Sequence, residues 1–145
     1  MLGTKNFFLK TGLTQIETTK QLIENLQKPI EELLYNIKRY KIPVSLVLFY
    51  TEEDISEALS KHIRLTDVLR TIQIGESYFN FVFLPFTEVE NSYAFLKETE
   101  RKLLQNTEYL FHIEEVEPAV NNFYNFINSF LFEIQEREKE KHIGY

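Results

Sequence analysis

The middle of the chain carries three charged residues, Arg64, Asp67 and Arg70, whose side-chain types could bind an anionic ligand. A guanidinium can form paired hydrogen bonds with a phosphate or with the edge of a guanine base, and a carboxylate can accept hydrogen bonds from guanine N–H groups. The same residue types also form surface ion pairs, which stabilise a protein by less than about 1 kcal/mol. The spacing leaves both interpretations open, a ligand site and an ion pair where a strand begins.

The other residue types that commonly carry catalysis or bind metals show no usable spacing. His62, His112 and His142 are far apart and the chain has no cysteine, so the sequence contains neither a zinc motif nor a disulfide. The acidic clusters at 52–54 and 114–115 fit the solvated ends of helices or strands, and no phosphate-binding loop, dinucleotide fingerprint or nucleophile elbow occurs. A two-carboxylate hydrolase site stays an alternative, although nothing in the sequence pairs these acids, and we expect no metal site and no cofactor.

Length and composition predict a single folded domain, residues 1–145. Hydrophobic residues make up 43% of the 145 residues, enough for one core. The formal net charge of −6 opposes binding to nucleic acid or to an anionic membrane. The longest apolar runs, 46–50 and 81–85, are too short to cross a bilayer, and the N-terminus lacks the apolar stretch of a secretory signal. We expect a soluble cytoplasmic protein.

The first half of the chain predicts a long helix, a strand and a short helix. Apolar residues recur at steps of three and four through 14–41, where Pro29 either kinks the helix or opens a second one. Residues 44–50 are apolar without a helical period, which is typical of a buried central strand. Residues 51–54 resemble a capping box, after which a short helix should follow. The predicted helix stripe consists of Leu22, Leu26, Ile30, Leu33, Leu34 and Ile37.

The second half predicts a hairpin, a helix, a strand and a final helix. Strands at 67–74 and 77–84 flank Gly75, and Phe79, Phe81 and Phe83 alternate onto one face. Thr87 and Glu90 fit a capping box that opens a helix ending near residue 105, and 108–116 fits a fourth strand. A last helix should begin at Pro118. The order is helix, then β-α-β-β-α-β, then helix.

This order predicts an α+β fold with a ferredoxin-like βαββαβ core. Its sheet should be antiparallel, with both crossover helices on the same face. One N-terminal and one C-terminal helix would be added to that core. Because many unrelated functions use this architecture, the fold alone predicts no activity.

Four segments, in order, resemble the GGDEF-type diguanylate-cyclase domain over roughly residues 9–105. The resemblance implies a nucleotide-cyclase-like fold, and in that family the strand equivalent to 44–50 ends in an aspartate that holds magnesium. It also implies that the hairpin turn carries the family's signature. The similar segments are 11–13, 39–46, 64–67 with Arg70, and 83–85.

The same resemblance implies that catalysis has been lost. Tyr50 stands in place of the metal-binding aspartate, and a phenol is a poor magnesium ligand because its pKa lies near 10. Ile74 replaces a glycine that would bare the backbone to the nucleotide, and only Glu76 remains as a candidate acid. Only 13 residues separate Tyr50 from Arg64, which leaves little chain for a substrate pocket. The degenerate signature turn consists of Gln73, Ile74, Gly75, Glu76 and Ser77.

The resemblance therefore implies an inactive bacterial signalling module. Arg64 and Asp67 match the RxxD pattern of the family's product-binding site, so cyclic di-GMP is the expected ligand, with Arg70 nearby. One alternative is a protein-interaction or dimerisation domain with no nucleotide, and another is an active nucleotide enzyme with rearranged ligands. Phe126 and Phe132 lie off the main stripe of the last helix, which favours a dimer or partner interface.

Overall fold

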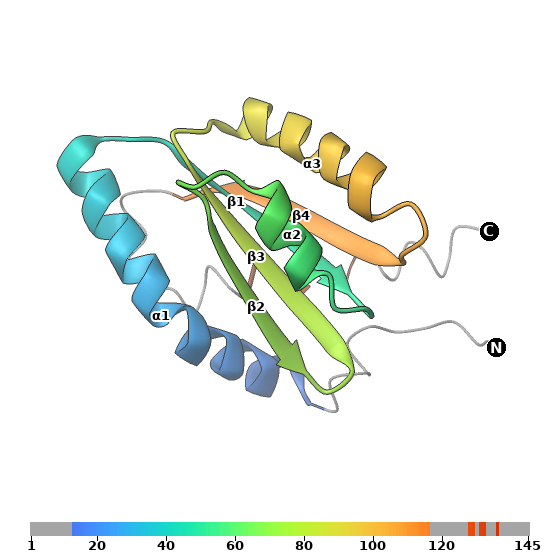
Figure 1. The fold of residues 1–145 in the computed structure, drawn as a ribbon. Helices are drawn as coiled ribbons and strands as arrows, with labels where there is room; N and C mark the ends of the chain where they lie inside the picture. The colour runs from blue at the N-terminus through green and yellow to red at the C-terminus, as the bar shows by residue number, and fades with distance from the viewer. Residues whose placement is uncertain (1–12, 117–127, 130, 133–135, 137–145) are drawn as a thin grey trace.

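The structure is a computed structural model that describes residues 13–116, 128–129, 131–132 and 136. Residues 13–116 contain three helices and four strands, and all seven follow the predicted order (Figure 1). Their bounds are α1 Gln15–Tyr40, β1 Val44–Thr51, α2 Ser56–His62, β2 Val68–Ile74, β3 Ser77–Pro85, α3 Val89–Leu103 and β4 Tyr109–Glu115.

The four strands form one antiparallel sheet in the order β2-β3-β1-β4. β1 therefore lies in the interior of the sheet, between β3 and β4, while β2 and β4 are the edges. The predicted α+β class and antiparallel sheet are confirmed. The strand order is consistent with the ferredoxin-like arrangement of a βαββαβ chain.

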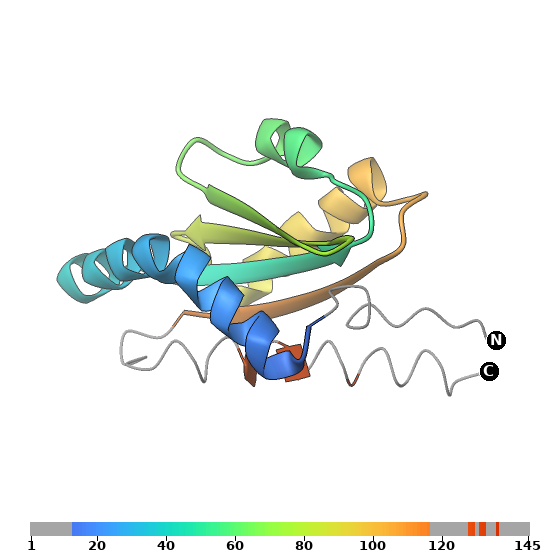
Figure 2. The same cartoon turned by 90° about the horizontal axis from the view of Figure 1, so that it is seen from below.

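Helices cover both faces of the sheet (Figure 2). α1 lies on one face, and α2 and α3 lie together on the other, as the right-handed crossover rule predicts. Leu46, Leu48 and Tyr50 of β1 pack on the α1 side, whereas Val47 and Phe49 pack against α2 and α3. All eight residues of β1 are buried, which explains why this segment is uniformly apolar instead of alternating.

α1 is a single helix that continues through Pro29. Five residues of its predicted apolar stripe pack on the sheet, and Leu22 and Leu26 are fully buried, whereas the side chain of Leu34 is outside the described part. The five are Leu22, Leu26, Ile30, Leu33 and Ile37. The helix begins with a capping box between Thr14 and Glu17, and it ends at Lys41, whose φ of 54° lies in the left-handed region. Pro29 therefore lies inside one helix and does not open a second one.

Both predicted capping boxes are wrong. Thr51 is the last residue of β1, and its hydroxyl donates to the carbonyl of Glu53 at 2.7 Å. The hydroxyl of Thr87 donates to the carbonyl of Pro85 at 3.2 Å. Neither α2 nor α3 has a side-chain hydrogen bond at its N-cap. In each case the threonine hydroxyl bonds to a backbone carbonyl before the helix begins, because short hydroxyl side chains readily bond to nearby backbone groups.

The described residues of the C-terminal segment are helical at 128–129, 131–132 and 136. Leu131 is fully buried in the core on the α1 side, and the hydroxyl of Thr19 donates to Asn128 Oδ1 at 3.5 Å. Phe132 is 52% exposed, whereas Phe126 lies outside the described residues. In the part of the chain that the structure describes, no helix combines the length and apolar character needed to span a membrane.

Candidate ligand site beside Arg64

The loop between α2 and β2 closes on itself through Arg64 and Asp67. The Asp67 carboxylate accepts from the Arg64 backbone N–H at 2.8 Å, from Nε at 3.0 Å and from Nη2 at 2.8 Å. The Asp67 side chain is 1% exposed, while the Arg64 side chain is 54% exposed. The carboxylate is therefore committed to Arg64, and the guanidinium is held rigidly with one side toward solvent.

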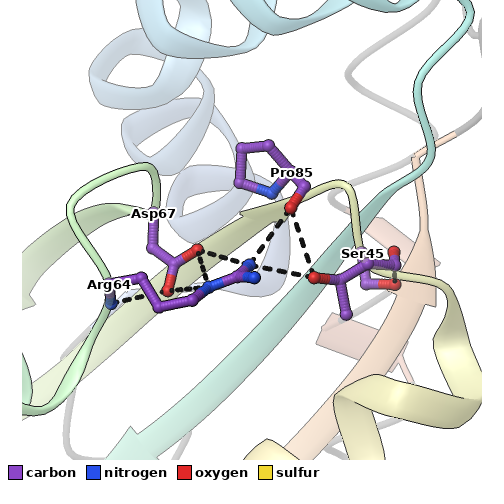
Figure 3. A network of polar contacts seen from close by, with 5 residues as sticks. Ser45, Arg64, Asp67 and Pro85 are labelled. Atoms are coloured by element: carbon purple, nitrogen blue, oxygen red, sulfur yellow. Dashed lines mark hydrogen bonds and ion pairs between the residues drawn. The ribbon is translucent and has the colours of Figure 1, made fainter.

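The same guanidinium ties this loop to the connection between β3 and α3 (Figure 3). Arg64 Nη2 donates to the carbonyl of Pro85 at 3.1 Å and to the hydroxyl of Thr87 at 2.9 Å. The hydroxyl of Ser45, in β1, donates to the backbone carbonyl of Thr87 at 2.8 Å. We call these five residues the arginine clip. The clip joins the α2–β2 loop, the β3–α3 connection and the start of β1.

A pocket of about 310 Å³ opens beside the clip, on the sheet face that carries α2 and α3. This volume is at the lower end of the usual range for small-molecule sites. Its walls combine the clip with one side of α3 and the end of α2. The lining residues are His62, Arg64, Asp67, Leu84, Thr87, Asn91, Ala94, Phe95 and Glu98.

His62 and Phe95 form an aromatic wall of this pocket. Their rings stack with centroids 5.3 Å apart and an interplanar angle of 29°. The Thr99 hydroxyl donates to the Phe95 carbonyl at 2.8 Å, and its oxygen lies 3.0 Å from His62 Nε2, a hydrogen bond that helps to hold the imidazole ring in place. Burial and the charge of Lys102 lower the pKa of His62, which keeps the imidazole neutral at pH 7.

The structure brings Arg64 and Asp67 together but places Arg70 elsewhere. Val68 and Ile72 of β2 pack on the α1 side of the sheet, and alternation puts Arg70 on that same face. Arg70 is exposed, and its Nη1 donates to the carbonyl of Leu69 at 2.9 Å. The pocket beside Arg64 lies on the opposite face.

Tyr50, at the position of the metal-binding aspartate in the family that the sequence resembles, is fully buried on the α1 side of the sheet. Its hydroxyl donates to Ser77 Oγ at 3.1 Å, and its ring meets Phe79 edge-on with centroids 4.6 Å apart. A neutral phenol in this packed, solvent-free position is well satisfied without a cation. Across the described residues, no group of three or more acidic, histidine or cysteine side chains is placed to hold a metal ion.

The predicted signature turn is a tight hairpin with no room to wrap a ligand. Ile74 and Ser77 are paired, so Gly75 and Glu76 alone make the turn. Gly75 has a φ of 62°, as the first position of a type II′ turn requires. The Ile74 side chain is buried in the core, whereas Glu76 is exposed. Gln73 Nε2 closes the turn by donating to the carbonyl of Gly75 at 3.2 Å.

Several residues of the pocket were not identified from the sequence. Asn91, Ala94, Phe95 and Glu98 follow the spacing of one helical face, so their common side was predictable from the period of 3.6. This face of α3 lies beside Arg64 because the clip ties the α2–β2 loop to the connection that leads into α3. His62 stands alone in the sequence pattern because Phe95, the ring on which it stacks, is distant in the sequence.

No protein-family model and no curated protein matches the chain. Several solved structures are similar to it in fold, among them two structures of PelD. One is PelD 156–455 from Pseudomonas aeruginosa PA14 in complex with c-di-GMP, with a TM-score of 0.54, and the other is PelD 158-CT from Pseudomonas aeruginosa PAO1, with a TM-score of 0.55. Each is 19% identical over 75% of this chain. The chain spans 45% and 44% of those structures, so less than half of each has a counterpart here.

Proposed function

We propose that this chain is a catalytically inactive, GGDEF-like module that binds cyclic di-GMP at the pocket beside Arg64. The observation that carries the proposal is the arginine clip: a half-exposed guanidinium, fixed by a buried carboxylate, at the mouth of a pocket of about 310 Å³. A preorganised arginine of this kind suits a guanine edge or a phosphate, because little side-chain entropy is lost on binding. The fold shared with PelD, which has been solved in complex with c-di-GMP, supports the same ligand class.

The clip changes the role proposed for Asp67. Both carboxylate oxygens accept from Arg64, and the side chain is almost completely shielded from solvent. We therefore assign Asp67 the positioning of the guanidinium, and Arg64 the contact with the ligand. Arg70 lies on the other face of the sheet, so its part in binding is a separate prediction that its own variant tests.

The proposal that the module is inactive rests on the environment of Tyr50. Phosphoryl transfer depends on a positioned cation and fixed charges. Here a buried phenol bonded to Ser77 fills the end of β1, and the neighbouring hairpin turn consists of two residues. These features support a binding role over the alternative of a rearranged nucleotide enzyme.

Isothermal titration calorimetry of the purified chain with cyclic di-GMP tests the proposal. We expect saturable heat for the wild type, a loss of at least about tenfold in affinity for Arg64→Lys, and no change for Arg39→Lys. Arg39 is a matched control because it is an exposed arginine on α1, away from the pocket. Lysine keeps the charge but cannot reproduce the planar fork. Arg70→Lys measures the contribution of the opposite face. Absence of binding by the folded wild type at high-micromolar ligand would refute the proposal.

A second candidate function is binding to a protein partner or to another copy of the chain. Exposed apolar side chains favour it: Phe132 is 52% exposed, Tyr40 61% and Phe86 64%. Tyr40 and Phe86 flank an apolar groove of about 490 Å³. The involvement of Phe126 stays a prediction. Sedimentation velocity across a hundredfold range of concentration tests self-association, and a constant monomer would count against it.

A further inference from the structure

The pocket beside Arg64 contains a second charged group whose position gives it a role in choosing the ligand. Because Asp67 is committed to Arg64, no free carboxylate oxygen of Asp67 is left to accept from the N–H groups of a guanine base. Glu98, on α3, is the other carboxylate in the pocket wall. If a carboxylate in this pocket distinguishes one base from another, that carboxylate is Glu98.

Glu98 is ionised and accessible. Its side chain is 54% exposed, and its partners are Lys102 at 3.2 Å and Arg101 at 3.4 Å, both on the same helix. The hydrogen bond and charge of Lys102 lower the pKa of Glu98, so the carboxylate acts only as an acceptor at neutral pH. Exposed pairs of this kind are weak, so a carboxylate oxygen can turn to a ligand at little cost.

The remaining walls suit a flat aromatic group. The stacked rings of His62 and Phe95 offer an aromatic surface. Ala94, next to Phe95 on α3, adds a small side chain to the pocket wall. Unpaired bases stack on such surfaces and are then read along their hydrogen-bonding edges. A volume of about 310 Å³ accommodates one base rather than a whole cyclic dinucleotide.

We propose that Glu98 is a specificity-determining residue that accepts from N1–H and the 2-amino group of one guanine base, while Nη1 of Arg64 donates to O6 of the same base. Adenine would present an unprotonated N1 to the carboxylate and an amino group to the guanidinium, so both contacts would become repulsive. This inference rests on the proposed function, since it assumes that a cyclic dinucleotide enters the pocket beside Arg64. It adds the residue by which that pocket would select guanine.

Calorimetry with cyclic di-GMP and cyclic di-AMP tests this role in the wild type, Glu98→Gln, Glu98→Ala and the control Glu90→Ala. Glu90 is an exposed acid of the same helix that does not line the pocket. We expect the wild type to prefer cyclic di-GMP by at least about tenfold. Both Glu98 variants should lose about 10- to 100-fold in affinity for cyclic di-GMP, which is the range of a charged hydrogen bond. In the same variants, the ratio of the affinity for cyclic di-GMP to the affinity for cyclic di-AMP should decrease.

The direction of the change separates recognition from simple electrostatics. Cyclic di-GMP carries two negative charges, so removing a nearby carboxylate would strengthen binding if Glu98 acted only through its charge. Unchanged or increased affinity in both Glu98 variants, with the wild type still binding, would overturn this inference and leave the proposed function intact. A wild type that binds neither dinucleotide would overturn both. Thermal melts confirm that each variant is folded, as expected for substitutions at exposed positions.

Discussion

Replacing Arg64 with methionine should destabilise the protein far more than the loss of an ordinary surface arginine. Methionine keeps much of the aliphatic stem but removes every guanidinium contact, including those to Asp67, Pro85 and Thr87. The Asp67 carboxylate, 1% exposed, would retain only the backbone N–H of residue 64 as a donor among these contacts. Stability should fall because a shielded charge would lose its counter-charge.

The magnitude follows from the burial of the two partners. Removing one member of a buried ion pair costs about 3–5 kcal/mol. Since the Arg64 side chain is half exposed, water can reach part of the space it leaves, and we expect a loss of about 2–3 kcal/mol. For a chain of this size, that corresponds to a decrease in Tm of roughly 5–10 °C.

Urea unfolding followed by circular dichroism measures the change, with Arg101→Met as the matched control. Arg101 is 64% exposed and pairs with Glu98 at 3.4 Å, so its loss should cost less than about 0.5 kcal/mol. The double variant Arg64→Met/Asp67→Asn should be more stable than the sum of the two single changes predicts, by at least about 1 kcal/mol. A cost below 0.5 kcal/mol for Arg64→Met, or strict additivity in this cycle, would refute the clip as a stabilising network.

Three further predictions concern other parts of the fold. Tyr50→Phe should cost about 1 kcal/mol in urea unfolding because it removes a buried hydrogen bond, whereas Tyr50→Asp should cost more than about 3 kcal/mol and give no magnesium-dependent turnover of guanosine triphosphate. Gly75→Ala should cost at least about 1 kcal/mol, because its φ of 62° is unfavourable for residues with a Cβ. The lowered pKa of His62 makes its contribution to stability complete above the unfolded pKa near 6.5, and the contribution decreases as the pH falls below that value toward the folded pKa. Two nearby charges act on His62: Lys102 opposes protonation of the imidazole and Glu98 favours it. His62→Gln should therefore weaken the pH dependence of the free energy of unfolding between about pH 7.5 and 5.

The elements could be predicted because each depends on a pattern within one segment. The unbroken apolar run of β1 reflects burial on both faces, and the stripe of α1 reflects burial on one. Gly75 marked the hairpin because only a two-residue turn with positive φ joins strands in this register. The two predictions of capping boxes were wrong because a capping hydrogen bond is not decided by a pattern within one segment. A hydroxyl near a helix start has several backbone partners, and Thr51 and Thr87 use other carbonyls.

The site could be predicted only in part. The spacing of Arg64 and Asp67 indicated a pair, but the position of the guanidinium also depends on Pro85 and Thr87, which lie more than twenty residues after Arg64. Such contacts leave no periodic signal in the sequence. The placement of Arg70, by contrast, was available from alternation with Val68, since both occupy even positions of one strand.

The guanidinium of Arg64 both stabilises the fold and is proposed to contact the ligand, so a substitution of Arg64 changes stability and affinity together. If the ligand contacts only the exposed side of Arg64, the clip stays closed and ligand raises the Tm by mass action. If instead the ligand competes with Asp67, each binding event must uncover a shielded carboxylate, and affinity falls by the cost of opening the clip. In that case weakening the clip at Thr87 should improve binding while lowering the Tm. Thr87→Val removes a hydroxyl that contacts Arg64 but leaves the guanidinium in place. Equal or weaker binding by this variant would support the closed clip, in which Asp67 holds the arginine and never meets the ligand.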